Sequence, residues 1–221
     1  MRRRDEEPDF EAQRARMVKR QLRRRGIADE RVLEAMVRVP RERFVPESVR
    51  DRAYADSALP IGHQQTISQP WVVAAICQAL ELGGEESVLE IGTGSGYSAA
   101  ILALLARRVT SVERIPELVE GARAVLAELL VANVEVVLGD GSRGHDEGAP
   151  YDAIAVHAAT PEAPHSLLSQ LGSGGRLVVP IATGSADLLT AFRREGEELR
   201  QETLGPCRFV PLIGVEGFEP G

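Results

Sequence analysis

The chain has 221 residues, of which 43% are hydrophobic and 27% charged, and its formal net charge is −7 at pH 7. A chain of this length and composition folds as one globular unit with a sizeable core. The acidic balance argues against a body that binds nucleic acid, because phosphate binding needs a basic surface, and no apolar run is long enough to span a membrane.

The N-terminal segment differs from the rest of the chain because it is rich in arginine. Its basic residues are Arg2, Arg3, Arg4, Arg14, Arg16, Lys19, Arg20, Arg23, Arg24 and Arg25, and they are interleaved with Asp5, Glu6, Glu7, Asp9 and Glu11. They could form an arm for nucleic acid or an acidic partner, or the charge-paired face of a solvated helix, and we favour the helix. No apolar segment follows the arginines, so we expect a cytoplasmic protein without a secretory signal.

The predicted elements begin with a helix over residues 10–25, followed by a second helix that Asp29 would cap. The apolar faces of these two helices would contain Phe10, Met17, Val18 and Leu22, and then Val32, Leu33, Met36 and Val37. Residues 51–70 are predicted to be irregular, and irregular segments of that length are often functional. Further helices are predicted over 71–82, 97–105, 117–130 and 165–171, and strands over 87–91, 109–113, 134–138, 151–158, 175–181, 186–193 and 208–213.

This alternation predicts an α/β fold, with a parallel sheet covered by helices on both faces. The seven strands indicate a doubly wound, Rossmann-like sheet that is mostly parallel, with an antiparallel edge formed by the last strands. We therefore divide the chain into a helical extension over residues 1–57 and a main domain over residues 58–221, which together form one structural unit.

A glycine-rich loop between a strand and a helix is the strongest motif. It reads Glu90-Ile91-Gly92-Thr93-Gly94-Ser95-Gly96. Doubly wound folds bind ligands at the carboxyl ends of their strands, and glycines let a ligand approach the backbone closely. The spacing is G-x-G-x-G rather than the G-x-G-x-x-G of dinucleotide sites. Glu90 would repel a pyrophosphate but suits the cationic amino-acid part of S-adenosylmethionine, which we predict as the ligand.

Two more acids follow the next two strands. Glu113 ends the second strand, where a carboxylate can accept hydrogen bonds from both ribose hydroxyls. Asp140, followed by Gly141, comes after the third strand, where an adenine amino group would lie. Each acid alone could be an ordinary loop residue, but three at successive strand ends form a coherent cofactor site.

Several segments together resemble protein-L-isoaspartate O-methyltransferases. They are ALPIGHQQTISQP (58–70), VLEIGTGSGYSAAILA (88–103), VLGDGSRG (137–144), APYDAIAVHAATPEAP (149–164), QLGSGGRLVVPI (170–181) and FVPLIG (209–214). The T-I-S-x-P segment at residues 66–70, ahead of the glycine loop, is the feature specific to this family. The resemblance runs from about residue 38 to the C-terminal segment.

The resemblance implies a class I methyltransferase fold and a repair enzyme for damaged proteins. Such enzymes transfer a methyl group from S-adenosylmethionine to the free α-carboxylate of L-isoaspartyl residues, and less well to D-aspartyl residues. The ester then cyclises to a succinimide, whose hydrolysis returns some normal aspartate. The active-site serine of the family corresponds to Ser68, and Gln65, Thr66 and Ile67 of the same loop lie against the cofactor. We expect no metal, no nucleic acid or membrane partner, and a monomer.

Methyl transfer requires that the enzyme orient the substrate carboxylate. No proton has to be removed from it, because a carboxylate is already ionised at neutral pH. Ser68 would donate one hydrogen bond to the carboxylate and position it, without forming a covalent bond. Read without the family, Ser68 would instead be the N-cap of the helix that begins near Pro70. Thr66 and Ser68 are therefore predicted to contact the substrate.

The substrate backbone must also be held, since damage occurs in many sequences. Residues 209–213, with Val210 and Leu212, and the loop at Ile61 and His63 could pair with an extended peptide through main-chain hydrogen bonds. Activity should then survive alanine at Val210 or Leu212 better than proline.

The chain departs from the family at three positions. The family often has glycine at Gln64 and a small residue at His157, and its AAAP run contains Thr160 here. His157 is either a titrating contact to the substrate carboxylate or a tolerated packing variant, and we favour the packing variant. Rival functions on this scaffold are methylation of another carboxylate or a small molecule, a catalytically silent cofactor-binding module, and a nicotinamide oxidoreductase, which the loop spacing disfavours.

Overall fold

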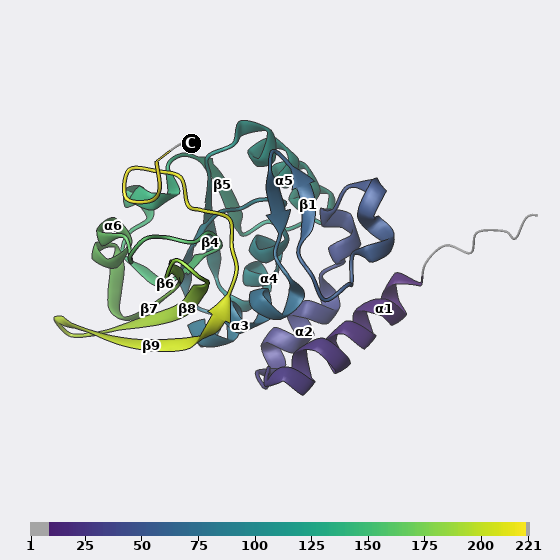
Figure 1. Cartoon of the computed structure of the whole chain (residues 1–221), viewed down its shortest axis with the longest axis horizontal. Coiled ribbons are helices and arrows are strands. Elements are labelled where there is room, and N and C mark those ends of the chain that lie inside the picture. Colours follow the sequence, from purple (N-terminus) through teal and green to yellow (C-terminus); the bar gives the residue numbers. More distant parts are fainter. Residues whose placement is uncertain (1–8, 220–221) are drawn as a thin grey trace, which may run out of the picture.

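A computed structural model describes residues 9–219, which form a twisted sheet with helices on both faces (Figure 1). The helices are α1 (Phe10–Met17), α2 (Glu30–Arg38), α3 (Pro70–Leu80), α4 (Tyr97–Leu105), α5 (Pro116–Glu128) and α6 (His165–Ser169). The strands are β1 (Leu59–Gly62), β2 (Gln65–Ile67), β3 (Ser87–Ile91), β4 (Arg108–Glu113), β5 (Val134–Leu138), β6 (Tyr151–Val156), β7 (Leu171–Ala182), β8 (Asp187–Glu195) and β9 (Glu198–Cys207).

The main sheet has seven strands in the order β5-β4-β3-β6-β7-β8-β9. The strands β5, β4, β3, β6 and β7 are parallel to one another. Strands β8 and β9 extend the sheet in antiparallel pairing after β7, which confirms the predicted mostly parallel sheet. The chain runs outward from β3 through β4 to β5 and then returns to the other side of β3 as β6. The carboxyl end of β3 is therefore the switch point of the fold, where such sheets bind ligands.

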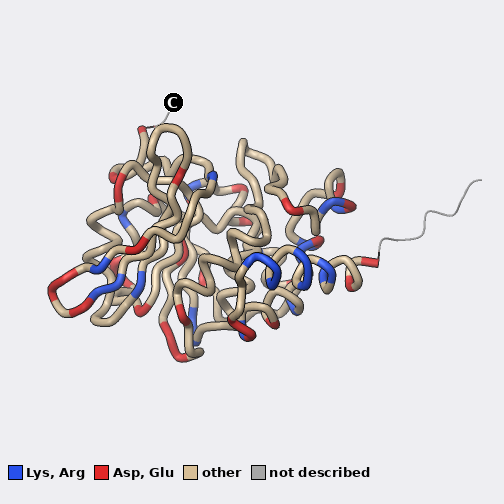
Figure 2. Tube along the Cα trace, turned by 60° about the horizontal axis from the view of Figure 1, so that its bottom comes forward, with Lys and Arg blue, Asp and Glu red and all other residues tan. Residues whose placement is uncertain are grey.

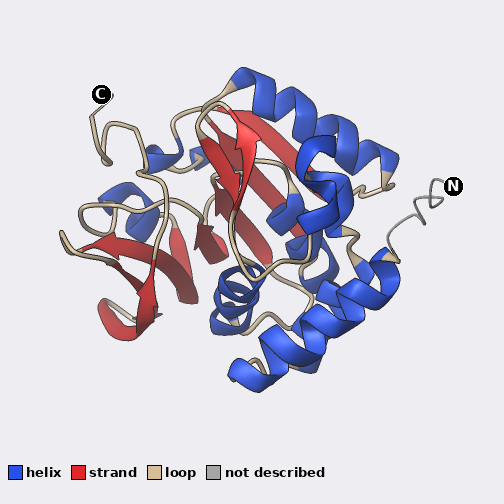
Figure 3. Ribbon diagram, turned by 45° about the vertical axis from the view of Figure 1, so that its right-hand side comes forward, coloured by secondary structure: helices blue, strands red, loops and turns tan. Residues whose placement is uncertain are grey.

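Alternate residues of the central strands face two separate hydrophobic cores. Val88 and Ala153 pack with α3, α4 and α5 on one face, whereas Leu89 and Ile154 pack with α6 on the other. Period-two alternation of buried residues is what a sheet covered on both faces requires. The ribbon view shows these layers, with the sheet between the helices (Figure 3).

The N-terminal helices pack into the larger of the two cores. The predicted helix over 10–25 is confirmed as α1 followed by one π-helical segment (Val18–Leu22) and a 3₁₀ turn (Arg23–Arg25). The same core contains Met17 and Leu22 of this segment together with residues of α3 and α4. The division of the chain at residue 57 stays a prediction, and the buried contacts run across it.

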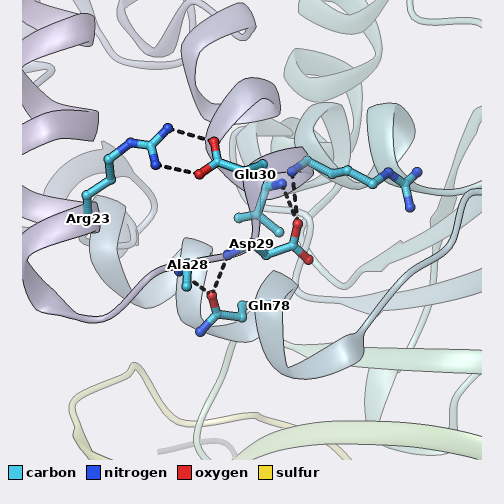
Figure 4. Close-up of polar contacts among 7 residues, drawn as sticks. Arg23, Ala28, Asp29, Glu30 and Gln78 are labelled. Carbon is cyan, nitrogen blue, oxygen red and sulfur yellow. Dashed lines mark hydrogen bonds and ion pairs between the residues drawn. The ribbon is translucent and has the colours of Figure 1, made fainter.

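The cap of α2 ties the extension to the main sheet. The side chain of Asp29 accepts hydrogen bonds from the backbone N–H groups of Arg31 and Val32, which confirms the predicted N-cap (Figure 4). On the other side, Oε1 of Gln78 in α3 accepts from the backbone N–H groups of Ala28 and Asp29, at 2.7 and 3.0 Å. The predicted apolar face of α2 is wrong only at Val37, whose side chain is 42% exposed.

Basic residues gather along α1 and the turns after it, as Figure 2 shows. Several are paired: Arg14 lies 3.9 Å from Glu42, Arg23 2.5 Å from Glu30, and Arg25 3.1 Å from Asp56. These are charge pairs of the kind expected for a solvated helix face, although their partners lie outside that helix. The prediction also included Arg2, Arg3 and Arg4 and the acids Asp5, Glu6 and Glu7, which lie outside the described residues.

Two predicted elements are wrong. The segment over 51–70 is not irregular throughout, because β1 and β2 pair in it as an antiparallel hairpin. The turn of this hairpin places His63 and Gln64 at φ values of 50° and 59°. The last strand is β9, not residues 208–213, which make only isolated bridges to Ala159 and Phe218. Pro211 lacks an N–H group, so it interrupts a strand ladder there.

Candidate functional site

The glycine loop lies at the carboxyl end of β3, where the fold predicts a ligand site. Gly92, Gly94 and Gly96 have φ values of 89°, 53° and 88°, a conformation that side chains rarely adopt. Across the site, a Cβ atom on Gly141 would lie 2.5 Å from a methyl group of Ile91, so only glycine fits there.

A partly open cavity, which we call the cofactor cavity, lies beside this loop. It lies at the carboxyl ends of the strands, where doubly wound folds bind their ligands. Its walls contain the predicted cofactor residues Gln65, Thr66, Ile67, Gly92, Thr93, Gly94, Ser95, Glu113 and Gly141. They also contain residues that the sequence did not indicate, among them Tyr97, Ser98, Arg114 and Ile115. Gly96, Glu90 and Asp140 were predicted too, but they do not line it.

Glu113 ends β4 and holds the two sides of the cavity together. Its Oε2 atom accepts a hydrogen bond from the backbone N–H of Gly94 at 3.0 Å. Its Oε1 atom accepts from the N–H groups of Arg114 and Ile115, at 2.8 and 3.1 Å. The carboxylate is therefore fixed at the cavity wall and keeps lone pairs for ligand hydroxyls.

Glu90 lies behind the glycine loop and is completely buried. Its Oε2 atom accepts from the hydroxyl of Ser111 at 2.5 Å, and that hydroxyl also lies 2.5 Å from Oγ1 of Thr93. Oε1 has no hydrogen-bond partner among the described residues. Burial raises the pKa of Glu90 to about 7. Glu90 thus supports the glycine loop through the hydroxyl groups of Ser111 and Thr93, and its carboxylate does not line the cofactor cavity.

Asp140 lies after β5 and holds the C-terminal segment. Its Oδ1 atom accepts from the N–H and hydroxyl groups of Ser142 at 3.0 and 2.8 Å, and Oδ2 accepts from the N–H of Val215 at 2.9 Å. Partial burial raises the pKa of Asp140, but these hydrogen bonds outweigh it, so the pKa is lowered overall. The predicted bond to an adenine amino group has no test in this geometry and stays a prediction.

A second hollow, which we call the outer groove, shares a wall with the cofactor cavity. Thr66, Ser68, His157 and Val210 line both. The rest of the outer groove is formed by Arg25, Ala58, Gln69, Trp71, Val72, Pro206, Cys207, Arg208 and Phe209. A group that enters from the outer groove therefore meets the cofactor cavity across one layer of side chains.

Ser68 is half-buried in this wall, and its position is set by Arg41. The guanidinium of Arg41 is fully buried and donates to the carbonyl oxygens of Ser68 at 2.8 Å and Ala53 at 2.7 Å. It also lies 4.8 Å from the ring centre of Tyr97, which lines the cofactor cavity. The N-cap of α3 is Gln69 and makes no side-chain cap bond, so the alternative role of Ser68 as N-cap is wrong. The hydroxyl of Ser68 is free for another partner in the described structure.

His157 follows β6 and is 9% exposed. Its Nε2 atom lies 2.7 Å from the hydroxyl oxygen of Ser98 and 3.5 Å from Oε1 of Glu90. Burial lowers the pKa of His157 to about 4, which keeps the imidazole neutral at physiological pH. The packing interpretation is thus supported by burial, and the same side chain separates the two hollows.

The structure places other predicted substrate contacts elsewhere. Ile61 and His63 line a different hollow, with Gly94, Ser95 and α5. The N–H and carbonyl groups of Leu212 already bond Ala159 and Phe218, and the carbonyl of Val210 also accepts from Ala159. Main-chain pairing of a peptide with Leu212 is therefore wrong as predicted, although the side chains of Val210 and Leu212 line the cofactor cavity.

The described part of the chain was compared with the requirements of a metal site and of a membrane-spanning helix. Within residues 9–219, no group of three or more His, Cys, Asp or Glu side chains is arranged to hold a metal ion. Over the same residues, no helix has the length and apolar character that crossing a membrane requires.

Comparison with known proteins assigns the family. Residues 12–217 match the family described as Protein-L-isoaspartate(D-aspartate) O-methyltransferase. The chain is 56% identical over 216 residues to Protein-L-isoaspartate O-methyltransferase 1 of Rhodopseudomonas palustris strain HaA2, covering 97% of this chain and 88% of that protein. It is 52% identical to Protein-L-isoaspartate O-methyltransferase of Methanoculleus marisnigri, covering 94% of each.

Solved structures agree with this assignment. One protein-L-isoaspartate O-methyltransferase superposes with a TM-score of 0.82 at 30% identity, covering 92% of this chain and 67% of that one. A putative relative from Plasmodium falciparum, solved with S-adenosyl-L-homocysteine, has the same fold, with a TM-score of 0.79 at 23% identity over 94% of this chain and 99% of its own. With the glycine loop, the shared wall and these matches together, the chain belongs to the protein-L-isoaspartate(D-aspartate) O-methyltransferase family.

Proposed function

We propose that this protein transfers a methyl group from S-adenosylmethionine to the free α-carboxylate of L-isoaspartyl residues, and less well to D-aspartyl residues, in damaged proteins and peptides. Methylation starts repair, because the ester closes to a succinimide that hydrolyses partly to normal aspartate. The observation that carries the proposal is the wall of Thr66, Ser68, His157 and Val210 between the cofactor cavity and the outer groove. A monomer located in the cytoplasm stays a prediction from the sequence.

The cofactor cavity fits S-adenosylmethionine in its position in the fold and in its hydrogen-bond acceptors. The glycine loop would lie along its amino-acid part, and Glu113 would accept hydrogen bonds from its ribose hydroxyls. Gly141 packs against Ile91 in the same cavity wall, where a Cβ atom would collide with that side chain. When bound, the cofactor supplies an electrophilic methyl group on a sulfonium.

The protein needs no general base for this reaction, because the substrate carboxylate is ionised at neutral pH. Ser68 donates one hydrogen bond, which orients the carboxylate without the stronger charge quenching of a lysine or arginine. The neutral imidazole of His157 and the side chain of Val210 belong to the same wall and would exclude water from the reacting groups. Orientation of this kind can lower a barrier by up to about 7–11 kcal/mol.

The test uses methyl-labelled S-adenosylmethionine and two peptides of identical sequence, one isoaspartyl and one aspartyl. We expect base-labile label on the isoaspartyl peptide alone. Ser68→Ala should reduce kcat/KM by about 10- to 100-fold, as expected for one hydrogen bond to a charged group. Ser57→Ala, at an exposed serine of the preceding segment, is the matched control and should retain full activity.

Two results would contradict the proposal. Binding of S-adenosyl-L-homocysteine without label on either peptide would point to another methyl acceptor or to a silent module. Equal label on both peptides would show that the site does not distinguish isoaspartate from aspartate.

A further inference from the structure

The outer groove continues away from the cofactor cavity into a further hollow, which we call the distal hollow. The two share Arg25, Trp71 and Pro206, so they form one path along the surface between α3 and the end of β9. The distal hollow is lined by Arg25, Gly26, Ile27, Trp71, Ala75, Gln78, Ala79, Glu81, Leu189, Leu204, Gly205 and Pro206. The path therefore begins at Ser68 and leads over Trp71 to Leu204.

Trp71 is held rigidly at the junction of the two hollows. Its indole N–H donates to the carbonyl oxygen of Arg25 at 3.1 Å, and the guanidinium of Arg25 lies 4.6 Å from the centre of the indole ring. Asp56 pairs with Arg25 at 3.1 Å and accepts from the side chain of Gln69 at 2.7 Å. The arginine is thus paired with a carboxylate and covers one face of the indole, which keeps Trp71 ordered at the junction.

The surface that the distal hollow presents to a ligand is mostly apolar. Leu204, Ala75 and Ala79 supply aliphatic surface, and Ile27 and Leu189 also line the hollow but are only 3% and 2% exposed. Its polar side chains already have partners inside the protein. Gln78 bonds the backbone at residues 26, 28 and 29, and Glu81 pairs with Arg176. Leu204 is 37% exposed, so apolar surface remains to be covered there.

We propose that the outer groove and the distal hollow bind the substrate polypeptide on one side of the isoaspartyl residue, with an apolar substrate side chain in the distal hollow. This inference rests on the proposed function, which supplies the occupant: a carboxylate of a polypeptide at Ser68 must have its flanking chain in the groove that opens there. The outer groove begins at Ser68 and continues into the distal hollow. The aliphatic lining of the distal hollow suits an apolar side chain of the substrate. Damaged sites with an apolar residue at the matching distance are then the preferred substrates.

The experiment uses one short isoaspartyl core peptide and two series of longer peptides. Each longer peptide carries a glycine-serine flank on the N-terminal or the C-terminal side, with a single leucine placed at successive positions. We expect one flank and one position at which leucine raises kcat/KM by about tenfold over the leucine-free peptide, which is the scale of burying one aliphatic side chain. The core peptide defines the activity that does not depend on the distal hollow.

Two variants on the same strand separate binding from folding. Leu204→Ser should abolish the leucine advantage and leave kcat/KM for the core peptide unchanged. Leu199→Ser is the matched control, because Leu199 is also 37% exposed on β9 but does not line the distal hollow, and it should keep the full advantage. Equal advantages in Leu204→Ser and the wild type would overturn the proposal, as would the absence of any favoured position in the wild type.

The tryptophan gives a second measurement without turnover. Trp71 is the single tryptophan of the chain, so its fluorescence reports on the junction directly. With S-adenosyl-L-homocysteine present, the favoured leucine peptide should change the fluorescence at lower concentrations than the core peptide does. If no isoaspartyl peptide is methylated at all, the proposed function fails first; methylation that ignores the flank rejects the inference alone.

Discussion

Nε2 of His157 lies 3.5 Å from Oε1 of Glu90, behind the glycine loop. Burial lowers the pKa of His157 to about 4 and raises the pKa of Glu90 to about 7. Near pH 6 the two groups therefore face each other as a neutral imidazole and a neutral acid, which avoids burying two charges. The nearby Glu113 also raises the pKa of Glu90, by charge repulsion, and the buried Cys77 lies on the other side as a neutral thiol.

The two pKa shifts predict opposite effects of pH on stability. For His157, with an ordinary pKa of 6.5, stability is lost as pH falls from about 6.5 to 4, because the unfolded chain takes up the proton first. For Glu90, with an ordinary pKa of 4.5, stability is lost as pH rises from about 4.5 to 7, because the unfolded chain releases its proton first. In the wild type these slopes largely cancel between pH 4.5 and 6.5.

Substituting either residue should reveal the pH dependence of stability that the other residue causes. From pH 4.5 to 6.5, the free energy of unfolding should fall by about 1–3 kcal/mol in His157→Asn and rise by a similar amount in Glu90→Gln, relative to the wild type. Urea unfolding at both pH values measures this. Slopes of the same sign in both variants would contradict the opposite pKa shifts of the two groups.

Glu113→Gln should weaken binding of S-adenosyl-L-homocysteine by about 10- to 100-fold. The carboxylate accepts hydrogen bonds from three backbone N–H groups, of Gly94, Arg114 and Ile115, and an amide NH₂ group cannot replace one of its two oxygens as acceptor. Isothermal titration calorimetry gives the Kd directly. Glu120→Gln, at an exposed position of α5, should bind like the wild type, and an equal loss there would remove the assignment.

Arg41→Met should lower both stability and activity. The substitution leaves the carbonyl oxygens of Ser68 and Ala53 without their buried donor, which costs about 1–3 kcal/mol of the free energy of unfolding. Because Ser68 is no longer held, kcat/KM for an isoaspartyl peptide should fall even at temperatures where the variant is folded. Arg38→Met, at the exposed end of α2, controls for loss of a charge. Full activity in folded Arg41→Met would show that the position of Ser68 does not depend on Arg41.

Asp29→Ala should destabilise the protein by about 0.5–2 kcal/mol through loss of the N-cap of α2. Thermal unfolding checks this, with Asp51→Ala as a control at an exposed aspartate that caps no helix. Affinity for S-adenosyl-L-homocysteine should remain unchanged at temperatures where both proteins are folded. A change in affinity would mean that the extension shapes the cofactor cavity as well as the core.

The sequence predicted best where local signals and tertiary environment agree. The bounds of β3, α4 and β5 match the predicted ranges, because short apolar runs there end at glycines or turns. The hairpin of β1 and β2 was missed because its turn uses His63 and Gln64 rather than glycine or asparagine. The polar, exposed strand β9 was missed because it has no alternation and is formed by pairing with β8.

The site residues could likewise be predicted only where the signal is local in the sequence. The glycine loop and Glu113 were visible because their spacing depends on one strand and the turn after it. The support of Ser68 by Arg41 was not, since 27 residues separate the two and only the folded chain brings them together. Likewise Glu90 was expected to face the ligand, but Ser111 of β4 and His157 after β6 lie against its carboxylate and it is completely buried.

The single layer of side chains between the two hollows bears on how an isoaspartyl carboxylate would reach the cofactor cavity. In an isoaspartyl residue the free carboxylate is attached directly to a main-chain carbon, whereas in aspartate a methylene group separates them. A thin partition lets a main chain come close enough to present the shorter group. Discrimination would then depend on the length of the reacting arm, so that many unrelated surroundings of the lesion can be accepted.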